Sequence, residues 1–338
     1  MNILCALESA HESNCRPGRQ LEQCKLRIVA LAGGVGGAKL AHGLAQVLPP
    51  KDLTIIVNTG DDFEHYGLYI CPDLDTVCYT LAGLANTATG WGRVNETWHV
   101  IENASKLGGP DWFRLGDQDL GTHLERTRRL NDGQTLTQIT KGFCETWGIK
   151  HAVLPMSDQP VRTIVETDEG ELAFQEYFVH RRCEPRVKGF RFEGVEQAEP
   201  AVGAREALQS ADVVIICPSN PWVSIDPILK VISLPSSIIQ RKEEKTVVAV
   251  SPIIDGQTVK GPAAKMYREL GIEPSALAVA NHYRGVATGF VLDKIDEQLE
   301  GAIMSLDMRT LVTNTLMNSL DKRSQLAKDM LNFIGNNL

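Results

Sequence analysis

The first clear pattern in the chain is a short apolar run that leads directly into glycine. Residues 27–32 become apolar after Arg27 and predict a buried strand, and residues 33–37 supply four glycines. In residues 38–48, apolar side chains recur every three to four positions, which predicts a helix that the next two prolines end. Residues 53–58 return as a second apolar strand. This strand–glycine–helix–strand order is a βαβ unit and predicts a parallel sheet.

Two later segments have the same buried character. Residues 212–217 and 246–251 are runs of β-branched residues, which suit central parallel strands covered on both faces. Each run ends in proline and small polar residues. Ligands of open α/β sheets lie beyond the carboxyl ends of the strands, so we expect the loops after all four strands to face one crevice.

The middle of the chain has a different pattern. Residues 111–147 have helical periodicity, and residues 148–155 predict another strand. Residues 161–166 and 171–179 flank a Thr-Asp-Glu-Gly turn, which indicates an antiparallel hairpin. The predicted fold class is therefore α/β: a Rossmann-like parallel sheet flanked by helices, with a smaller helical and antiparallel insert at about 86–205 that acts as a lid.

The two ends of the chain predict different things. Residues 296–336 show amphipathic helical patterns, and the folded domain is expected to span 27–338. Residues 1–26 are mostly polar and aperiodic and predict a poorly ordered extension, with a real accessory arm as the alternative.

Charge and composition narrow the class of protein. Acidic residues outnumber basic residues by 42 to 34, for a net charge of -8, so nucleic acid and anionic membranes are not expected as partners. No apolar run approaches the roughly 20 residues that span a bilayer. None of the eight cysteines has the spacing of a metal site, which favours a reducing, cytoplasmic location.

The glycine segment is the first candidate site. A glycine-rich turn between strand and helix exposes backbone N–H groups at the positive end of the helix, which favours a phosphate. The segment matches neither the Walker pattern nor the full GxGxxG spacing, and a tight turn needed only for packing is the alternative. The candidate phosphate-binding residues are Gly33, Gly34, Val35 and Gly36.

Acidic residues form the second candidate site. Asn58, Thr59, Asp61 and Asp62 end the second strand, and the Pro-Asp-Leu-Asp-Thr string at 72–76 follows a short loop. Carboxylates with few basic neighbours suit Mg²⁺, which would let an acidic site hold a phosphate. The predicted metal ligands are Asp61, Asp73 and Asp75, although helix capping by Asp73 or Asp75 is the alternative. Among Asp61, Asp62 and Asp75, one carboxylate is expected to orient or deprotonate an attacking hydroxyl.

Further polar residues follow other predicted strands or begin helices. His123 either contacts a ligand or is a buried structural histidine, and Arg126, Arg128 and Arg129 are interpreted as a solvated face. Lys260 and Lys265 flank Pro262 at a helix start, a second possible phosphate site. The other candidate substrate-binding residues are Asp117, Gln118, Thr122, Ser157, Asp158, Ser219, Asn220, Ser251 and Gly261.

Taken together, these segments resemble one known family. The glycine segment, the Pro-Asp-Leu-Asp-Thr string, residues 116–123, the Met-Ser-Asp-Gln-Pro and Pro-Ser-Asn-Pro strings and residues 251–265 are similar, in this order, to the motifs of the CofD family. That family comprises the 2-phospho-L-lactate transferases of coenzyme F-420 biosynthesis. The resemblance runs from about residue 27 to the C-terminal helices.

The resemblance implies an activity. The family moves a phospholactyl-type group from a guanosine diphosphate-linked donor to the terminal hydroxyl of the deazaflavin Fo; GMP leaves and Mg²⁺ is required. By analogy, Asp75 would contact Fo or the metal, residues 116–123 would line the same pocket, and the Met-Ser-Asp and Pro-Ser-Asn-Pro loops would face the donor. Gln118 stands where the family often has arginine. A homodimer is implied, and the three-carbon acid (lactate, enolpyruvate or glycerate) is left open.

Two alternatives stay open at this stage. A YvcK-like protein that binds nucleotide sugars and has no transferase activity would share the glycine segment and a similar second loop. A classical nicotinamide dehydrogenase is disfavoured by the altered glycine spacing.

Overall fold

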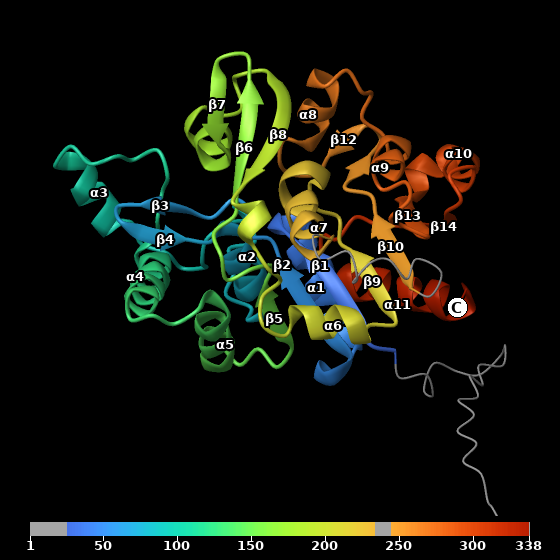
Figure 1. Cartoon of the computed structure of the whole chain (residues 1–338), viewed down its shortest axis with the longest axis horizontal. Helices are drawn as coiled ribbons and strands as arrows, with labels where there is room; N and C mark the ends of the chain where they lie inside the picture. Colours follow the sequence, from blue (N-terminus) through green and yellow to red (C-terminus); the bar gives the residue numbers. More distant parts are fainter. Residues whose placement is uncertain (1–25, 234–244, 338) are drawn as a thin grey trace, which may run out of the picture.

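A seven-stranded parallel sheet forms the centre of the molecule (Figure 1). The computed structural model describes residues 26–233 and 245–337, and the extension predicted for residues 1–26 lies almost wholly outside them. The strand order is β14-β13-β10-β9-β1-β2-β5. In chain order the strands are β1 (Ile28–Ala32), β2 (Leu53–Val57), β5 (Ala152–Pro155), β9 (Val213–Ile216), β10 (Thr246–Val250), β13 (Gly289–Asp293) and β14 (Arg309–Thr313).

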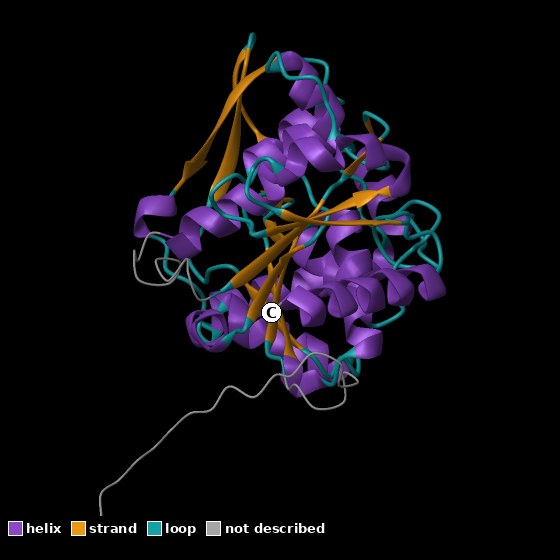
Figure 2. Cartoon of the chain, turned by 90° about the vertical axis from the view of Figure 1, so that its right-hand side faces the viewer, coloured by secondary structure: helices purple, strands orange, loops and turns teal. Residues whose placement is uncertain are grey.

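Helices cover both faces of this sheet (Figure 2). They are α1 (Gly34–Val47), α2 (Pro72–Leu81), α3 (His99–Lys106), α4 (Asp117–Asn131), α5 (Leu136–Thr146), α6 (Ala204–Ser210), α7 (Asp226–Ser233), α8 (Ala263–Glu269), α9 (Ala276–His282), α10 (Glu300–Met304) and α11 (Leu320–Asn337). Within the described ranges, no helix is long and apolar enough to cross a lipid bilayer.

The alternation of side chains along β1 divides the core into two layers. Ile28, Ala30 and Ala32 pack into the layer that contains α1, α2 and α11, whereas Val29 and Leu31 pack into the layer that contains α7, α8 and α9. Because β1 is buried on both faces, its sequence is apolar throughout, as expected for a central parallel strand. The Rossmann-like α/β prediction is confirmed.

Small antiparallel sheets stand at the edge of the main one. The predicted hairpin is present as β6 (Arg162–Thr167) and β7 (Gly170–Ala173), and β8 (Val187–Glu193) adds a third strand on the other side of β6. Two short hairpins, β3–β4 (Phe63–His65, Leu68–Ile70) and β11–β12 (Ile253–Ile254, Gln257–Thr258), complete the strands. The backbone N–H of Thr163 donates to the carbonyl of Gly60 at 2.6 Å, which ties β6 to the loop after β2.

Three expectations about the elements need correction. The first helix begins at Gly34 instead of residue 38, and Gly36 and Gly37 in its first turn pack closely on the loop after β9. The range 296–336 is not all helical: β14 lies within it, and β13 before it was not predicted. Finally, β5, which falls within the range 86–205 assigned to the insert, pairs with β2 in the main sheet.

The loops after β1 and β9 are joined by hydrogen bonds at the point where the strand order reverses. β1 continues to β2 on one side, and β9 begins the other half of the sheet. The hydroxyl of Ser219 accepts from the N–H of Gly33 at 3.1 Å and donates to the carbonyl of Gly33 at 2.7 Å. Such a reversal point is where open α/β sheets bind ligands.

The glycine segment is required for this close approach. Gly34 has a φ of +59°, which favours glycine. A Cβ on Gly36 would lie 2.1 Å from the carbonyl oxygen of Pro218, a backbone atom that cannot move aside alone. The packing interpretation of these glycines is therefore correct for Gly36, and it does not conflict with a phosphate at the helix start.

We expect Gly36→Ala to destabilise the fold by about 1–3 kcal/mol, because α1 must move away from the loop at Pro218. The matched control is Gly121→Ala, at an exposed position of α4 with no atom within 4 Å of the added Cβ. That change is expected to stabilise the protein by about 0.5–1 kcal/mol. Chemical denaturation of both variants measures the difference, and equal effects would contradict the packing argument.

Candidate functional site

Asp61 and Asp73, called here the acid pair, are joined by Asn58, and Asp73 lies directly against the start of α1. The side-chain amide of Asn58 donates to both carboxylates, to Asp73 at 3.0 Å. Asp73 also accepts from the N–H of Gly34 at 2.6 Å. A Cβ on Gly33 would lie 2.5 Å from a carboxylate oxygen of Asp73, so only glycine fits beside this side chain. The loops after β1 and β2 and the first turn of α2 therefore meet at one point.

The acid pair carries more negative charge than its surroundings neutralise. Burial, followed by the charges of Asp73 and Asp62, raises the pKa of Asp61 well above its usual value. Burial also raises the pKa of Asp73 to about 6, although hydrogen bonds from Asn58, Gly34 and Ser224 act in the opposite direction. Neighbouring Asp62 is buried as well, and its pKa rises to about 8 in spite of Arg162 and the thiol of Cys71.

The acid pair fits a divalent cation. Two buried carboxylates share one neutral amide donor, and the second oxygen of Asp61 has only a long contact of 3.5 Å with the amide of Gln175. Oxygen donors of this kind are the ligands that Mg²⁺ prefers. A bound cation would offset the buried charge of both carboxylates and the repulsion that Asp73 and Asp62 exert on Asp61.

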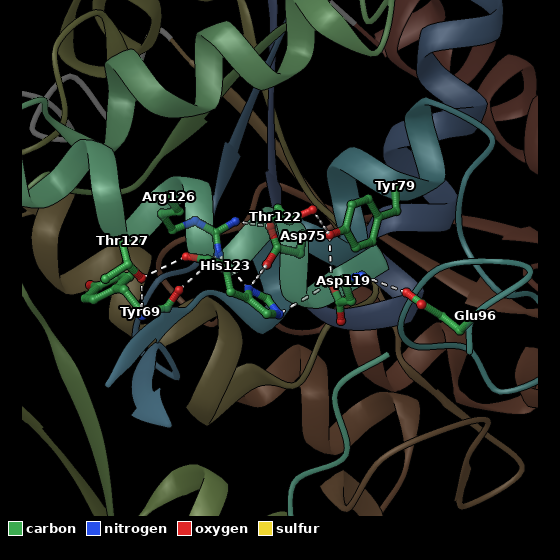
Figure 3. Close-up of polar contacts among 9 residues, drawn as sticks. All are labelled: Tyr69, Asp75, Tyr79, Glu96, Asp119, Thr122, His123, Arg126 and Thr127. Carbon is green, nitrogen blue, oxygen red and sulfur yellow. Dashed lines mark hydrogen bonds and ion pairs between the residues drawn. The ribbon is translucent and has the colours of Figure 1, made fainter. Parts of the chain in front are cut away.

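Asp75 lies in a separate, fully buried network between α2 and α4 (Figure 3). One terminal nitrogen of Arg126 donates to a carboxylate oxygen of Asp75, and the other lies 3.1 Å from Nδ1 of His123. A guanidinium group can only donate, so Nδ1 of His123 accepts and the proton of the neutral ring is on Nε2. Nε2 lies 3.4 Å from Oδ1 of Asp119. We call Asp75, Asp119, His123 and Arg126 the Asp75 network.

Further contacts fix this network in place. The hydroxyl of Tyr79 donates to Asp119 at 2.7 Å and lies 2.8 Å from the hydroxyl of Thr122. Burial acts to raise the pKa of Asp119, but the hydrogen bonds from His123 and Tyr79 hold it below the usual value. Glu96 accepts from two N–H groups in the first turn of α4 at 2.8 Å and so anchors that turn.

Asp75, Asp119 and His123 offer three ligand atoms within 4.8 Å of one another, which is metal-like spacing. Arg126 already neutralises Asp75 and donates to His123, so the positive charge that these groups require is present. The second carboxylate oxygen of Asp75 is buried and has no hydrogen-bond partner within the described part of the chain. The geometry therefore separates Asp75 from the acid pair and leaves it one oxygen for a ligand.

The structure brings some of the predicted residues together and places others elsewhere. Gly33, Gly34, Asn58, Asp61, Asp73 and Ser219 meet at the start of α1, and Thr59 and Asp62 follow in the same loop. Thr122 contacts the Asp75 network through Tyr79.

Several predicted residues hold local structure with their side chains. Asp117 accepts from Thr97 and from two N–H groups of α3, Asp158 accepts from an N–H of α5, and Gln118 donates to the carbonyl of Asn95. Ser157, Asn220 and Ser251 bond to groups within three residues of themselves. Lys265 pairs with Glu269, Lys260 donates to the carbonyl of Thr89 at 2.8 Å, and Gly261 has a φ of +83°.

The solvated-face interpretation of three arginines is wrong for Arg126. Arg128 and Arg129 pair with Glu125 near the surface, but Arg126 is 1% exposed and forms the centre of a buried network. Asp119, His123 and Arg126 are spaced four and three residues apart, so they share one face of α4. That spacing was the available signal, and it was missed together with Tyr79.

Comparison with known proteins identifies the family to which this chain is similar. The model of the family described as 2-phospho-L-lactate transferase CofD matches residues 28–326. A phosphoenolpyruvate transferase of Streptomyces griseus is 42% identical over 312 residues, which cover 90% of this chain and 98% of that protein. A 2-phospho-L-lactate transferase of Methanosarcina mazei is 39% identical over 301 residues, which cover 89% and 98%.

A solved structure shows the same fold. A member of the UPF0052 family from Bacillus halodurans has a TM-score of 0.58 and 15% identity, and the match covers 91% of this chain and 99% of that chain. At this identity the likeness concerns the fold alone. With the relatives above, the fold defines an α/β, Rossmann-like transferase. The chain belongs to the CofD family.

We expect Arg126→Met to destabilise the protein by about 3–5 kcal/mol, because it leaves the carboxylate of Asp75 buried without a counter-charge. Adding Asp75→Asn to this variant should recover much of the loss. Arg128→Met is the control, since this exposed pair is screened by water and should contribute little to stability. Denaturation curves of wild type, the single variants Arg126→Met and Asp75→Asn, the double variant and the control test the argument, and an additive double variant would contradict it.

Proposed function

We propose that the chain transfers a phosphorylated three-carbon acid group from a guanosine diphosphate-linked donor to the terminal hydroxyl of the deazaflavin Fo, with release of GMP, in coenzyme F-420 biosynthesis. The observation that carries the proposal is the contact of the acid pair with the first turn of α1 at the junction of β1 and β9. The names of the relatives, phosphoenolpyruvate transferase and 2-phospho-L-lactate transferase, support this class of donor.

Phosphate binding is assigned to the start of α1. The first N–H groups of a helix have no partner within it, and the helix dipole favours an anion there. The N–H of Gly34 is occupied by Asp73, so Val35 and Gly36 supply the next two N–H groups of the turn. Both residues are partly exposed at the reversal point, where a diphosphate can approach them.

Mg²⁺ is assigned to Asp61 and Asp73. When bound, the cation would offset charge on the transferred phosphorus and on the leaving GMP. The Mg²⁺ role predicted for Asp75 is not part of this proposal, because Arg126 already neutralises that carboxylate.

Asp75 is assigned to the acceptor. Its free oxygen is held rigidly by Arg126 and by α2, and it can accept a hydrogen bond from the attacking hydroxyl. Phosphoryl-type transfer depends mainly on positioning and charge neutralisation, so a carboxylate fixed by Arg126 suits the orientation of the acceptor. Asp62, whose charge interacts with both Asp75 and Asp61, stays the second candidate for the base.

The test is incubation of the protein with Fo, Mg²⁺ and guanosine diphosphate-linked donors that carry lactate, enolpyruvate or glycerate. The product mass and released GMP identify the reaction and the acid. Calorimetry with UDP-sugars covers the YvcK-like alternative: binding of a UDP-sugar without any transfer to Fo would favour it. The cytoplasmic homodimer stays a prediction.

We expect Asp75→Asn to lower kcat/KM for transfer by at least about 100-fold, because the amide cannot take a proton from the hydroxyl. The change also leaves Arg126 buried without a counter-charge, so the variant should be less stable than wild type, and its Tm must show that it is folded at the assay temperature. Asp132→Asn, a surface change on the same protein, is the control for general effects. Normal turnover by the Asp75 variant would remove this residue from the mechanism.

We expect Mg²⁺ at about ten times its Kd to raise the Tm of the wild-type protein by roughly 2 °C or more, since it relieves repulsion within the acid pair. Asp61→Asn should be more stable than wild type without Mg²⁺ and should lose the Mg²⁺-dependent shift. Thermal unfolding with and without Mg²⁺ provides the measurement. An unchanged shift in the variant would place the cation elsewhere.

A further inference from the structure

Two basic side chains, Arg323 and Lys260, lie close enough to Lys39 on α1 for their charges to act on it. Lys39 lies on α1 one turn after Val35, Arg323 lies on α11, which packs along α1, and Lys260 lies in the loop before α8. Figure 1 shows α1 and α11 side by side, and residues of the two helices pack against each other. We call these residues the basic group.

Arg323 is held in place by α1. One of its terminal nitrogens lies 3.0 Å from Nδ1 of His42, and a Cβ on Gly43 would meet the backbone carbonyl of Arg323 at 2.3 Å. Burial, followed by the charge of Arg323, lowers the pKa of His42, so its neutral ring accepts from the guanidinium. The Nε atom of Arg323 is buried and has no hydrogen-bond partner within the described part of the chain.

Lys260 comes from a different part of the chain, the loop before α8. Its ammonium group donates to the carbonyl of Thr89 at 2.8 Å, and a Cβ on Gly90 would lie 2.1 Å from it. The charge of Lys260, like that of Arg323, acts on Lys39. Lys39 itself is half-buried, and burial lowers its pKa first of all.

The basic group has no acidic counterpart. Within residues 26–233 and 245–337, none of its three members forms a salt bridge, although the chain as a whole has a net charge of -8. By contrast, Lys265, in the helix that follows Lys260, pairs with Glu269. Three cations that repel one another, two of them half-buried, are unfavourable unless an anion joins them.

We propose that Lys39, supported by Arg323 and Lys260, is a binding residue for the diphosphate of the donor. A helical side chain leans toward the N-terminus of its helix, so Lys39 reaches back over the turn that presents the N–H groups of Val35 and Gly36. Arg323 and Lys260 raise the positive potential on either side of it. The inference rests on the proposed function for the identity of the anion.

This group also accounts for charge balance at the site. The acid pair repels a diphosphate, and the helix dipole of α1 supplies only about half a charge. The basic group supplies the missing attraction on the solvent side of the same helix. Nothing about the packing of Lys39 alone requires the charge, since its aliphatic stem would pack as well with a methionine terminus.

The experiment measures binding of inorganic pyrophosphate and of GDP by calorimetry, separately from transfer. We expect Lys39→Met to raise the Kd for both probes by about tenfold or more, as for loss of one charge-assisted contact. Lys39→Arg should keep most of the affinity. Arg323→Gln should raise the Kd by a smaller factor, and the wild-type Kd should rise more steeply with salt than that of Lys39→Met.

Lys322→Met is the matched control, because this exposed neighbour of Arg323 changes the net charge equally and should leave both Kd values unchanged. Circular dichroism and Tm confirm that each variant folds. If Lys39→Met does not fold, Arg323→Gln tests the basic group independently. Unchanged Kd values in both variants, or no binding by wild type, would overturn the inference. Anion binding that depends on Lys39 without any transfer to Fo would instead refute the proposed function and leave this inference standing.

Discussion

The burial of carboxylates at the carboxyl edge of the sheet is the constraint on which the rest of this structure depends. A buried carboxylate is unfavourable unless hydrogen bonds or a counter-charge replace its lost hydration. The chain supplies a different compensation at each position: the N–H of Gly34 for Asp73, the amide of Asn58 for the acid pair and Arg126 for Asp75. Asp61, Asp73 and neighbouring Asp62 keep raised pKa values in spite of these contacts, and the proposed cation is assigned to the acid pair for this reason.

The same constraint explains the glycines. Asp73 reaches the start of α1 only because Gly33 has no side chain, and α1 approaches the loop at Pro218 only because Gly36 has none. The glycines therefore serve the packing of two loops and the access of an anion together. Stability and binding at this point use the same atoms, so a substitution that enlarges a glycine should affect both.

The sequence predicted the elements whose pattern is local and missed those that depend on tertiary contacts. The βαβ unit, the strands at β9 and β10 and the antiparallel hairpin have strong local patterns, and all are present. Edge strand β14, with the sequence Arg-Thr-Leu-Val-Thr, is only partly buried, so its pattern was mistaken for helix. The meeting of Asp61 and Asp73 could be expected from the sheet edge, but not the separation of Asp75. Asp75 lies two residues after Asp73 on α2, so the two side chains point about 200° apart around the helix. Asp75 therefore meets buried Arg126, which neutralises its carboxylate.

Side chains of opposite charge lie at different positions along α1. Asp73 and the proposed cation site lie at the helix start, while Arg323 contacts the same helix farther along, where α11 packs on it. A ligand with several negative charges is attracted only where both are in reach, along the first turn of α1. In the proposed reaction, a neutral acceptor alcohol experiences no such attraction, and the second oxygen of Asp75 is the group assigned to orient its hydroxyl. Under that proposal the charge pattern separates the binding of the anionic donor from that of the neutral acceptor, as a displacement at phosphorus needs.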